Sequence, residues 1–336
     1  MISSSLNSLN YSFFDKIKSV DYFLILLVLL VGAISVFSIY STESGEFSFY
    51  TKNHLIRLVS FFLLFLALSF VRVSTWYRQA YTFYLLGLLL LLLVIFFGIS
   101  ASGSKRWINL IVFNLQPSEL MKIAVIVSFA RYYHRIQTAD IESYKYLLQP
   151  IILLLIPCYL VITQPDLGTA MIICLIGSIT LFIAGLSRRF IIISLVSLLA
   201  AAPLLWTQLH SYQQQRIITL FSGQDDLQHH GYHIHQSKIA IGSGGLWGKG
   251  YGRGSQVQLG YIPEHKTDFI FTVLSEEFGF LGTISVIGLI VLITYLTYQV
   301  VNNSKIDMFQ RILGFGIISN FFFAAMINMS MVIGIL

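Results

Sequence analysis

Charged side chains that could take part in chemistry are scarce in this chain, and several lie at the ends of long apolar runs. Glu119 follows a Pro-Ser pair at the start of one such run, and Lys122 lies three residues further on. Residues three apart share one face of a helix. The two side chains therefore either neutralise each other as an internal ion pair or form the charged wall of a cavity, and these two arrangements are compatible.

Asp268 ends a long polar stretch and directly precedes the apolar residues Phe269, Ile270 and Phe271. An apolar edge of this kind disfavours the charged carboxylate and brings its pKa toward the range of a useful general base. The alternative is a structural role, in which Thr267 or Asp268 caps the first turn of the following helix. The residues alone leave both alternatives open.

Other charged residues also lie beside apolar runs. Lys105 and Arg106 belong to a Gly-Ser-Lys-Arg-Trp cluster, and Asp166 lies in a tight Gln-Pro-Asp-Leu-Gly turn. Asp166 either caps the next helix or faces a cavity. Glu276 and Glu277 continue the helix that follows Asp268, and we expect them to be solvated or paired rather than to react.

A glycine-rich segment is the remaining candidate for binding chemistry. Residues 242–254 contain seven glycines in thirteen positions, together with Lys249 and Arg253, and Lys238 lies just upstream. Glycine lets backbone N–H groups approach an anion closely, so such segments can bind phosphate. The alternative is a series of flexible turns that bind no ligand.

The composition shows which elements must position these residues. Of 336 residues, 56% are hydrophobic and 11% are charged, and the mean hydropathy is +0.77. Soluble domains carry about 25% charged residues. The chain is therefore not a soluble enzyme, a disordered protein, a coiled coil or a nucleic-acid-binding domain.

The apolar runs are long enough to cross a bilayer as helices, because backbone groups in lipid must bond within their own segment. The expected fold class is an all-α polytopic membrane protein, in which residues 1–336 form a single membrane domain. Nine spans are predicted, at residues 22–40, 54–71, 80–99, 117–133, 147–163, 168–186, 190–206, 270–300 and 312–335.

The distribution of Lys and Arg between the spans predicts the topology. Short junctions that alternate along the chain are rich in basic residues, which places the N-terminus in the cytoplasm by the positive-inside rule. Residues 207–269 then form a large extracytoplasmic loop, whose aromatic and apolar residues favour folding over disorder. The polar clusters around Arg106, Asp166 and Asp268 all face this same outer side, where they could line one cavity.

Several motifs in one order resemble the SEDS family of membrane proteins, named for shape, elongation, division and sporulation. Lys238 and the Gly-Lys-Gly around Lys249 are more similar to the elongation (RodA-type) branch than to the division (FtsW-type) branch. The resemblance implies a SEDS-type helical bundle of ten spans, of which we expect about nine in this chain and expect the last to be lacking. The motifs that carry it lie at residues 103–107, 116–119, 164–170, 236–245 and 263–271.

The resemblance also implies an activity. SEDS proteins of this kind are peptidoglycan glycosyltransferases that polymerise lipid II at the outer face of the bacterial cytoplasmic (inner) membrane. They work with a class B penicillin-binding protein, which crosslinks the glycan strands. Asp268 matches the essential aspartate of the family motif, and Glu119 and Lys122 match polar residues of the fourth helix.

The residues suit that chemistry. The acceptor sugar hydroxyl needs a base, for which Asp268 is the candidate, while Glu119 orients or tunes. The diphosphate leaving group needs positive charge, and a divalent cation such as Mg or Mn is compatible with it, although no cluster of metal ligands requires one. Candidate cations for the leaving group are Lys105, Arg106, Lys238, Lys249 and Arg253.

Two other functions compete with this hypothesis. A lipid-linked precursor flippase would also use many spans and a buried Glu119–Lys122 pair, but no inverted repeat or pair of broken helices is evident. A non-catalytic scaffold for the penicillin-binding protein is the other alternative.

Overall fold

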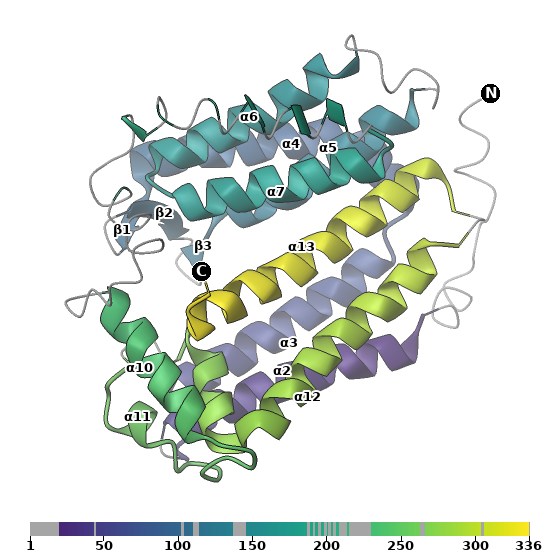
Figure 1. Cartoon of the computed structure of the whole chain (residues 1–336). Coiled ribbons are helices and arrows are strands. Elements are labelled where there is room, and N and C mark those ends of the chain that lie inside the picture. Colours follow the sequence, from purple (N-terminus) through teal and green to yellow (C-terminus); the bar gives the residue numbers. More distant parts are fainter. Residues whose placement is uncertain are drawn as a thin grey trace. The chain divides into compact units, whose positions relative to one another are not determined.

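The computed structural model describes most of the chain. The described residues are 20–43, 45–101, 104–109, 114–136, 146–186, 189–190, 192–193, 196–197, 200, 203, 206–207, 214, 230–262, 266–303 and 306–335. Long helices dominate this part of the chain, and Figure 1 shows them coloured along the sequence.

Eight helices in the described residues coincide with predicted membrane spans, which confirms the prediction of an all-α membrane protein. They are α2 (Tyr22–Thr42), α3 (Phe49–Ser69), α4 (Val73–Phe97), α5 (Pro117–His134), α6 (Leu148–Thr163), α7 (Leu167–Ile183), α12 (Ile270–Val301) and α13 (Met308–Ile333). Five of them are long and apolar enough to cross a membrane, namely α2, α3, α4, α12 and α13, while α6 and α7 are shorter apolar helices. The predicted span 190–206 falls largely outside the described residues.

A small antiparallel sheet, which the hydropathy pattern did not predict, joins α4 to α5. It consists of β1 (Ile99–Ala101), β2 (Ser104–Asn109) and β3 (Asn114–Leu115), in the order β1-β2-β3. Trp107 pairs with Ile99 across the first two strands. The sheet places Lys105 and Arg106 on β2, close in sequence to the start of α5.

Part of the long polar loop is also helical. It contains α10 (His230–Ser243) and the single turn α11 (Ser255–Gln258), with the glycine-rich segment between them. Gly245, Gly248, Gly250 and Gly252 all have positive φ angles. Residues other than glycine rarely adopt this backbone conformation, so the glycines permit a succession of turns here.

The chain divides into two compact units. Unit 1 contains Val71–Leu209 and Thr297–Phe321, and unit 2 contains Tyr11–Phe70, His210–Leu296 and Phe322–Leu336. The core of unit 1 forms where α5 packs against α4, α6 and α7, and it includes the fully buried Leu91, Met121 and Phe129. A separate cluster in unit 2 includes Phe269, Ile290 and Val332.

Candidate active site

In unit 1, an ion pair joins the small sheet to the start of α7. Arg106 Nε lies 3.2 Å from Asp166 Oδ2, and the Asp166 side chain is 5% exposed. Asp166 also caps α7, because its Oδ1 accepts a hydrogen bond from the backbone N–H of Thr169 and its Oδ2 from the Thr169 hydroxyl. Of the two predicted roles for Asp166, the structure therefore shows the helix cap.

Glu119 and Lys122 form an ion pair on α5. Lys122 Nζ lies 2.8 Å from Glu119 Oε2, with the two residues three positions apart. The Lys122 side chain is only 4% exposed, whereas that of Glu119 is 56% exposed. The pair is therefore asymmetric: the lysine is buried and the carboxylate is exposed. Lys105 on β2 is also exposed.

In unit 2, the most unusual backbone feature is a break in α12. Gly279 has φ 66° and ψ −161°, which is a conformation outside the helical region. A break of this kind leaves carbonyls on one side and N–H groups on the other without helical partners. In an apolar environment those groups must be bonded elsewhere.

The glycine-rich loop supplies the missing partners. Its backbone N–H groups at Lys249 and Gly250 donate to the carbonyls of Glu276 and Glu277, each at 3.0 Å. In the other direction, the N–H groups of Phe280 and Leu281 donate to loop carbonyls of Gly245 and Leu246, at 2.8 and 3.2 Å. We call these four hydrogen bonds the loop clasp. They occupy N–H groups that were candidates for phosphate binding.

Glycine is required at the centre of the loop clasp. A Cβ atom on Gly279 would collide with the backbone N of Gly248, and a Cβ on Gly248 would collide with the carbonyl of Glu277. Both glycines also have positive φ angles. Close backbone approach and left-handed geometry thus coincide at these two positions.

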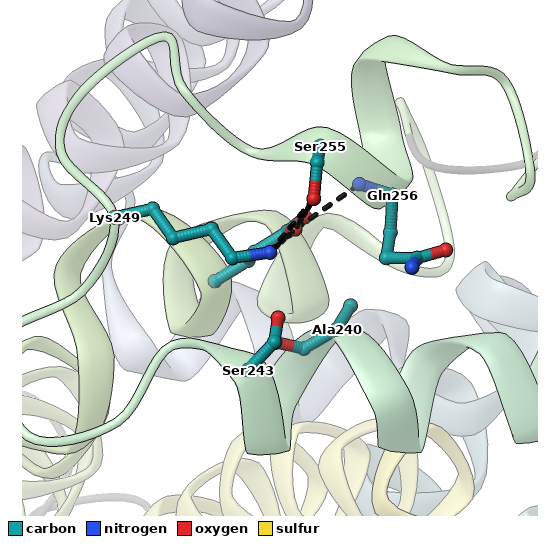
Figure 2. A network of polar contacts seen from close by, with 6 residues as sticks. Ala240, Ser243, Lys249, Ser255 and Gln256 are labelled. Carbon is teal, nitrogen blue, oxygen red and sulfur yellow. Dashed lines mark hydrogen bonds and ion pairs between the residues drawn. The ribbon is translucent and has the colours of Figure 1, made fainter.

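Two buried carboxylates, those of Glu276 and Glu277, also bind the glycine-rich loop. Glu276 is fully buried, and its Oε1 accepts hydrogen bonds from Lys249 Nζ at 2.6 Å, Ser255 Oγ at 3.2 Å and the Gln256 N–H at 3.1 Å. Figure 2 shows Lys249, from the glycine-rich loop, and Ser255 and Gln256, from the start of α11, converging on this network. Glu276 was expected to be either solvated or paired, and in the structure it is paired with Lys249.

Glu277 has different partners. Its Oε1 accepts hydrogen bonds from the Ser41 hydroxyl on α2 and from the backbone N–H of Gly252, the latter at 3.1 Å. Its side chain is buried as well. The two adjacent glutamates therefore tie α12 to the glycine-rich loop and, through Ser41, to α2.

Asp268 lies just before α12, on the surface of unit 2. Its backbone carbonyl accepts a hydrogen bond from Asn328 Nδ2 of α13 at 3.3 Å. Two residues earlier, Lys266 Nζ lies 3.7 Å from Glu43 Oε1 and 4.4 Å from the centroid of the Tyr50 ring. The segment that carries Asp268 is thus bonded to α13 through Asn328 and to Glu43 through Lys266.

Glu43 links that segment to the start of α3. Its Oε2 accepts hydrogen bonds from the N–H and hydroxyl of Thr51, at 3.0 and 2.6 Å, and its side chain is 3% exposed. Burial of the carboxylate opposes its ionisation and raises its pKa. Hydrogen bonds from the hydroxyls of Ser48 and Thr51 and from two backbone N–H groups outweigh that effect and lower the pKa of Glu43 to about 2.

Lys238 is an exposed cation near the same helix ends as Asp268. The neighbouring Ser237 hydroxyl lies 2.6 Å from that of Thr272 on α12 and donates to the carbonyl of Val332 on α13, at 2.8 Å. The Lys238 side chain lies close to Gly334, since a Cβ atom placed on this glycine would be 2.7 Å from Lys238 Nζ. Arg253, in the glycine-rich loop, is exposed too.

The predicted site residues therefore fall into two groups. Unit 1 carries the first group, and unit 2 carries the second. Among the described residues there is no cluster of three or more His, Cys, Asp or Glu side chains that could hold a metal ion. The first group is Lys105, Arg106, Glu119, Lys122 and Asp166, and the second is Lys238, Lys249, Arg253 and Asp268.

The sequence analysis missed the contributions of Glu43, Lys266 and Gly279. Gly279 did have a signal, since it is a glycine directly after a Glu-Glu-Phe triplet inside a predicted span. No signal in the sequence pointed to Glu43 and Lys266, because their ion pair joins two distant parts of the chain.

These features define a class: a polytopic helical membrane protein with a broken helix clasped by a glycine-rich loop, and with charged residues at helix ends. Residues 18–336 match the family model FTSW_RODA_SPOVE, described as a cell cycle protein. The chain belongs to this family, and it is a multi-pass membrane protein.

Curated relatives are similar over most of this chain. It is 40% identical to the peptidoglycan glycosyltransferase MrdB of Escherichia coli strain K12 over 256 residues, which cover 75% of this chain and 68% of that protein. It is 34% identical to MrdB of Helicobacter pylori strain 26695 over 278 residues, covering 82% and 71%. A probable peptidoglycan glycosyltransferase FtsW of Buchnera aphidicola is 31% identical over 294 residues, covering 86% and 76%.

Solved structures have the same fold. A chain from a peptidoglycan synthase complex, described as coordinating polymerization and crosslinking, superposes with a TM-score of 0.82 at 24% identity and covers 95% of this chain and 88% of that one. The rod shape determining protein RodA of Thermus thermophilus gives a TM-score of 0.66 at 23% identity, covering 93% and 85%.

Proposed function

We propose that this chain is a peptidoglycan glycosyltransferase of the RodA type, which polymerises lipid II into glycan strands for cell elongation. The curated relatives at 34–40% identity carry the activity in their names. The position of Asp268 supports the proposal for the reacting group: a surface carboxylate at the entrance to α12, on a backbone held by Asn328 and by the Lys266–Glu43 pair.

In this mechanism, Asp268 is the general base. Its carboxylate takes the proton from the 4-hydroxyl of the acceptor sugar as that oxygen attacks the anomeric carbon of the donor. The bond from the anomeric carbon to the diphosphate breaks, and the undecaprenyl diphosphate leaves. An α-linked donor becomes a β-linkage in this single inverting step, so no second nucleophilic carboxylate is needed.

The leaving diphosphate requires positive charge, and two of the candidate cations already have carboxylate partners. Lys249 is paired with Glu276, and Arg106 is paired with Asp166. In unit 2, Lys238 and Arg253 are exposed. Both Lys238 and Asp268 lie near the end of α13: a Cβ atom placed on Gly334 would be 2.7 Å from Lys238 Nζ, and Asn328 Nδ2 donates to the backbone carbonyl of Asp268. We therefore assign diphosphate binding first to Lys238, with Arg253 as a further candidate in the same unit.

The proposed setting is the outer face of the bacterial cytoplasmic membrane. The positive-inside distribution supports a cytoplasmic N-terminus and an extracytoplasmic location for residues 207–269. A lipid-linked substrate can reach a site at the helix ends without leaving the membrane. The proposed partner is a class B penicillin-binding protein, in line with the crosslinking named for the solved synthase complex.

A precursor flippase is the second candidate, because broken helices are common in transporters. In such proteins the backbone groups freed by the break coordinate the cargo. Here, four groups next to Gly279 are bonded to the glycine-rich loop instead. The loop clasp therefore favours the polymerase.

The test is polymerisation of lipid II by purified protein, with and without its penicillin-binding partner, comparing wild type with Asp268→Asn. Asp307→Asn is a matched control, since Asp307 also lies just before a helix, α13, and belongs to neither group of site residues. Loss of the base should lower the rate by about 10²–10⁴. Equal polymer from wild type and Asp268→Asn would remove Asp268 from the mechanism. Lipid movement in vesicles, with no polymer from any variant, would favour the flippase.

A further inference from the structure

Four arginine residues lie at one end of unit 1. They come from the first turns of α4, the last turn of α5 and the first turn of α13. The rings of Tyr77 and Phe309 lie 5.4 Å apart, which brings the starts of α4 and α13 together. We call this group the arginine cluster, and it consists of Arg78, Arg131, Arg135 and Arg311.

Arg131 is held in a fixed orientation. Its guanidinium carbon lies 4.5 Å from the centroid of the Tyr81 ring and 5.4 Å from that of Tyr77. Its Nη1 donates a hydrogen bond to the carbonyl of Arg78 at 2.7 Å. Stacking on aromatic faces and a carbonyl bond position a guanidinium well, but they do not neutralise its charge.

Arg135 shares one of these rings. Its guanidinium carbon lies 5.7 Å from the Tyr77 centroid, and its Nε donates to the Tyr77 hydroxyl at 3.0 Å. Two guanidinium groups thus lie within 6 Å of one ring. Like charges at such separations repel each other, so the arrangement favours an anion between or beside them.

In the described part of the chain, no carboxylate forms an ion pair with any member of the arginine cluster. The Nε atoms of Arg131 and Arg311 are buried, and no described residue accepts a hydrogen bond from either. A buried N–H of a charged group that lacks an acceptor is costly. Both observations show that the described residues leave the positive charge of the arginine cluster unbalanced, so an anionic acceptor at its exposed side, where Arg135 lies, would be favourable.

The location indicates the source of that acceptor. Trp76, Tyr77 and Tyr81 lie in the first turns of the membrane-spanning α4. Aromatic residues at span ends mark the level of the lipid headgroups. Arginine binds the phosphate group with paired N–H donors, and basic pockets at the ends of spans recognise anionic lipid headgroups.

We propose that the arginine cluster binds the phosphodiester headgroup of an anionic phospholipid, with Arg131 and Arg135 as its principal ligands. The acyl chains then lie along the apolar surface of α4, where Leu85 and Leu89 are exposed. This site is independent of the proposed polymerase reaction, because none of its residues belongs to either group of site residues.

The test measures lipid binding by native mass spectrometry, and thermal unfolding, of the full purified chain in neutral detergent. The added probes are dioleoyl phosphatidylglycerol, dioleoyl phosphatidylcholine and inorganic phosphate. We expect phosphatidylglycerol to remain bound and to raise the unfolding midpoint, while the other two probes do neither. Arg135→Gln and Arg131→Gln should each weaken phosphatidylglycerol binding about fivefold, since one basic residue near the membrane surface contributes about that factor.

Arg57→Gln on α3, in unit 2, is the matched control and should bind phosphatidylglycerol as wild type does. Tyr77→Phe removes only the hydroxyl that fixes Arg135, so it tests the site even if Arg131→Gln fails to fold. Weaker phosphatidylglycerol binding by Tyr77→Phe supports the proposal, and wild-type binding by Tyr77→Phe and Arg135→Gln together contradicts it. Equal binding of both lipids by the wild type would overturn it, as would equal stabilisation by inorganic phosphate.

Discussion

Lys249 Nζ lies 2.6 Å from Glu276 Oε1, although the two residues are 27 positions apart in the chain. Glu276 is completely buried, and the Lys249 side chain is 27% exposed. The ion pair therefore fixes the glycine-rich loop to α12 beside the break at Gly279. It also makes Lys249 a structural residue, with its charge already balanced.

Removing one partner of this pair should destabilise the protein. Lys249→Met leaves a buried carboxylate without its cation, which costs about 3 kcal/mol. The double variant with Glu276→Gln should recover part of that loss, because the uncompensated charge is gone. Unfolding midpoints of the four proteins in a double-mutant cycle measure the coupling. A cycle in which the two losses simply add would contradict the pairing.

Gly279→Ala should disrupt the loop clasp. The φ angle of 66° is strained for alanine, which costs about 1–3 kcal/mol, and its Cβ would also collide with the backbone N of Gly248. Gly288→Ala on the same helix is the matched control, since a Cβ there meets nothing within 4 Å. We expect a much lower unfolding midpoint for the first variant and an unchanged or higher one for the second. Similar midpoints for both would show that the break is unimportant for stability.

The Arg106–Asp166 pair can be separated from the helix cap by choice of substitution. Asparagine caps helices about as well as aspartate, so Asp166→Asn removes mainly the charge, whereas Asp166→Ala removes both contributions. We expect Asp166→Ala to lose about 1 kcal/mol more stability than Asp166→Asn, as measured by thermal unfolding. Arg106→Gln should resemble Asp166→Asn, and a larger loss for Arg106→Gln than for Asp166→Ala would contradict this account.

Glu43 predicts a pH dependence with a defined sign. Its pKa is lowered from 4.5 to about 2 in the folded protein. A lowered pKa means that the ionised form stabilises the fold, so this contribution is complete above pH 4.5 and is lost as the pH falls toward 2. Thermal unfolding of wild type and Glu43→Gln from pH 7 to pH 3 measures it. The difference in unfolding midpoint between wild type and Glu43→Gln should shrink over the acidic half of this range. A midpoint difference that stays constant with pH would show that ionisation of Glu43 is not its cause.

The local patterns in the sequence predicted much of this protein. Uniform apolar runs predicted the helical spans, because a backbone in lipid can satisfy its polar groups only within its own segment. The spacing of Glu119 and Lys122 predicted an ion pair as one of two compatible arrangements, and the pair forms at 2.8 Å. The turn around Asp166 predicted a helix cap as one of two alternatives, and the cap forms.

The elements that depend on distant partners were not predictable in the same way. The hydropathy pattern predicted one uninterrupted span over residues 270–300 and so missed the break in α12, although the adjacent Glu276, Glu277 and Gly279 were a local signal of it. The partners of Glu276 and Glu277 come from the glycine-rich loop and, in the case of Ser41, from a helix 236 positions away. Likewise, the acceptors and rings around Arg131 come from another helix.

The sequence by itself therefore determined the fold class and the local contacts of charged residues, since hydropathy and helical spacing act over a few turns of chain. The tertiary structure decided which charges are neutralised and which are left for a ligand. That outcome depends on whether two side chains from separate segments approach within about 3 Å. No local pattern encodes such a distance.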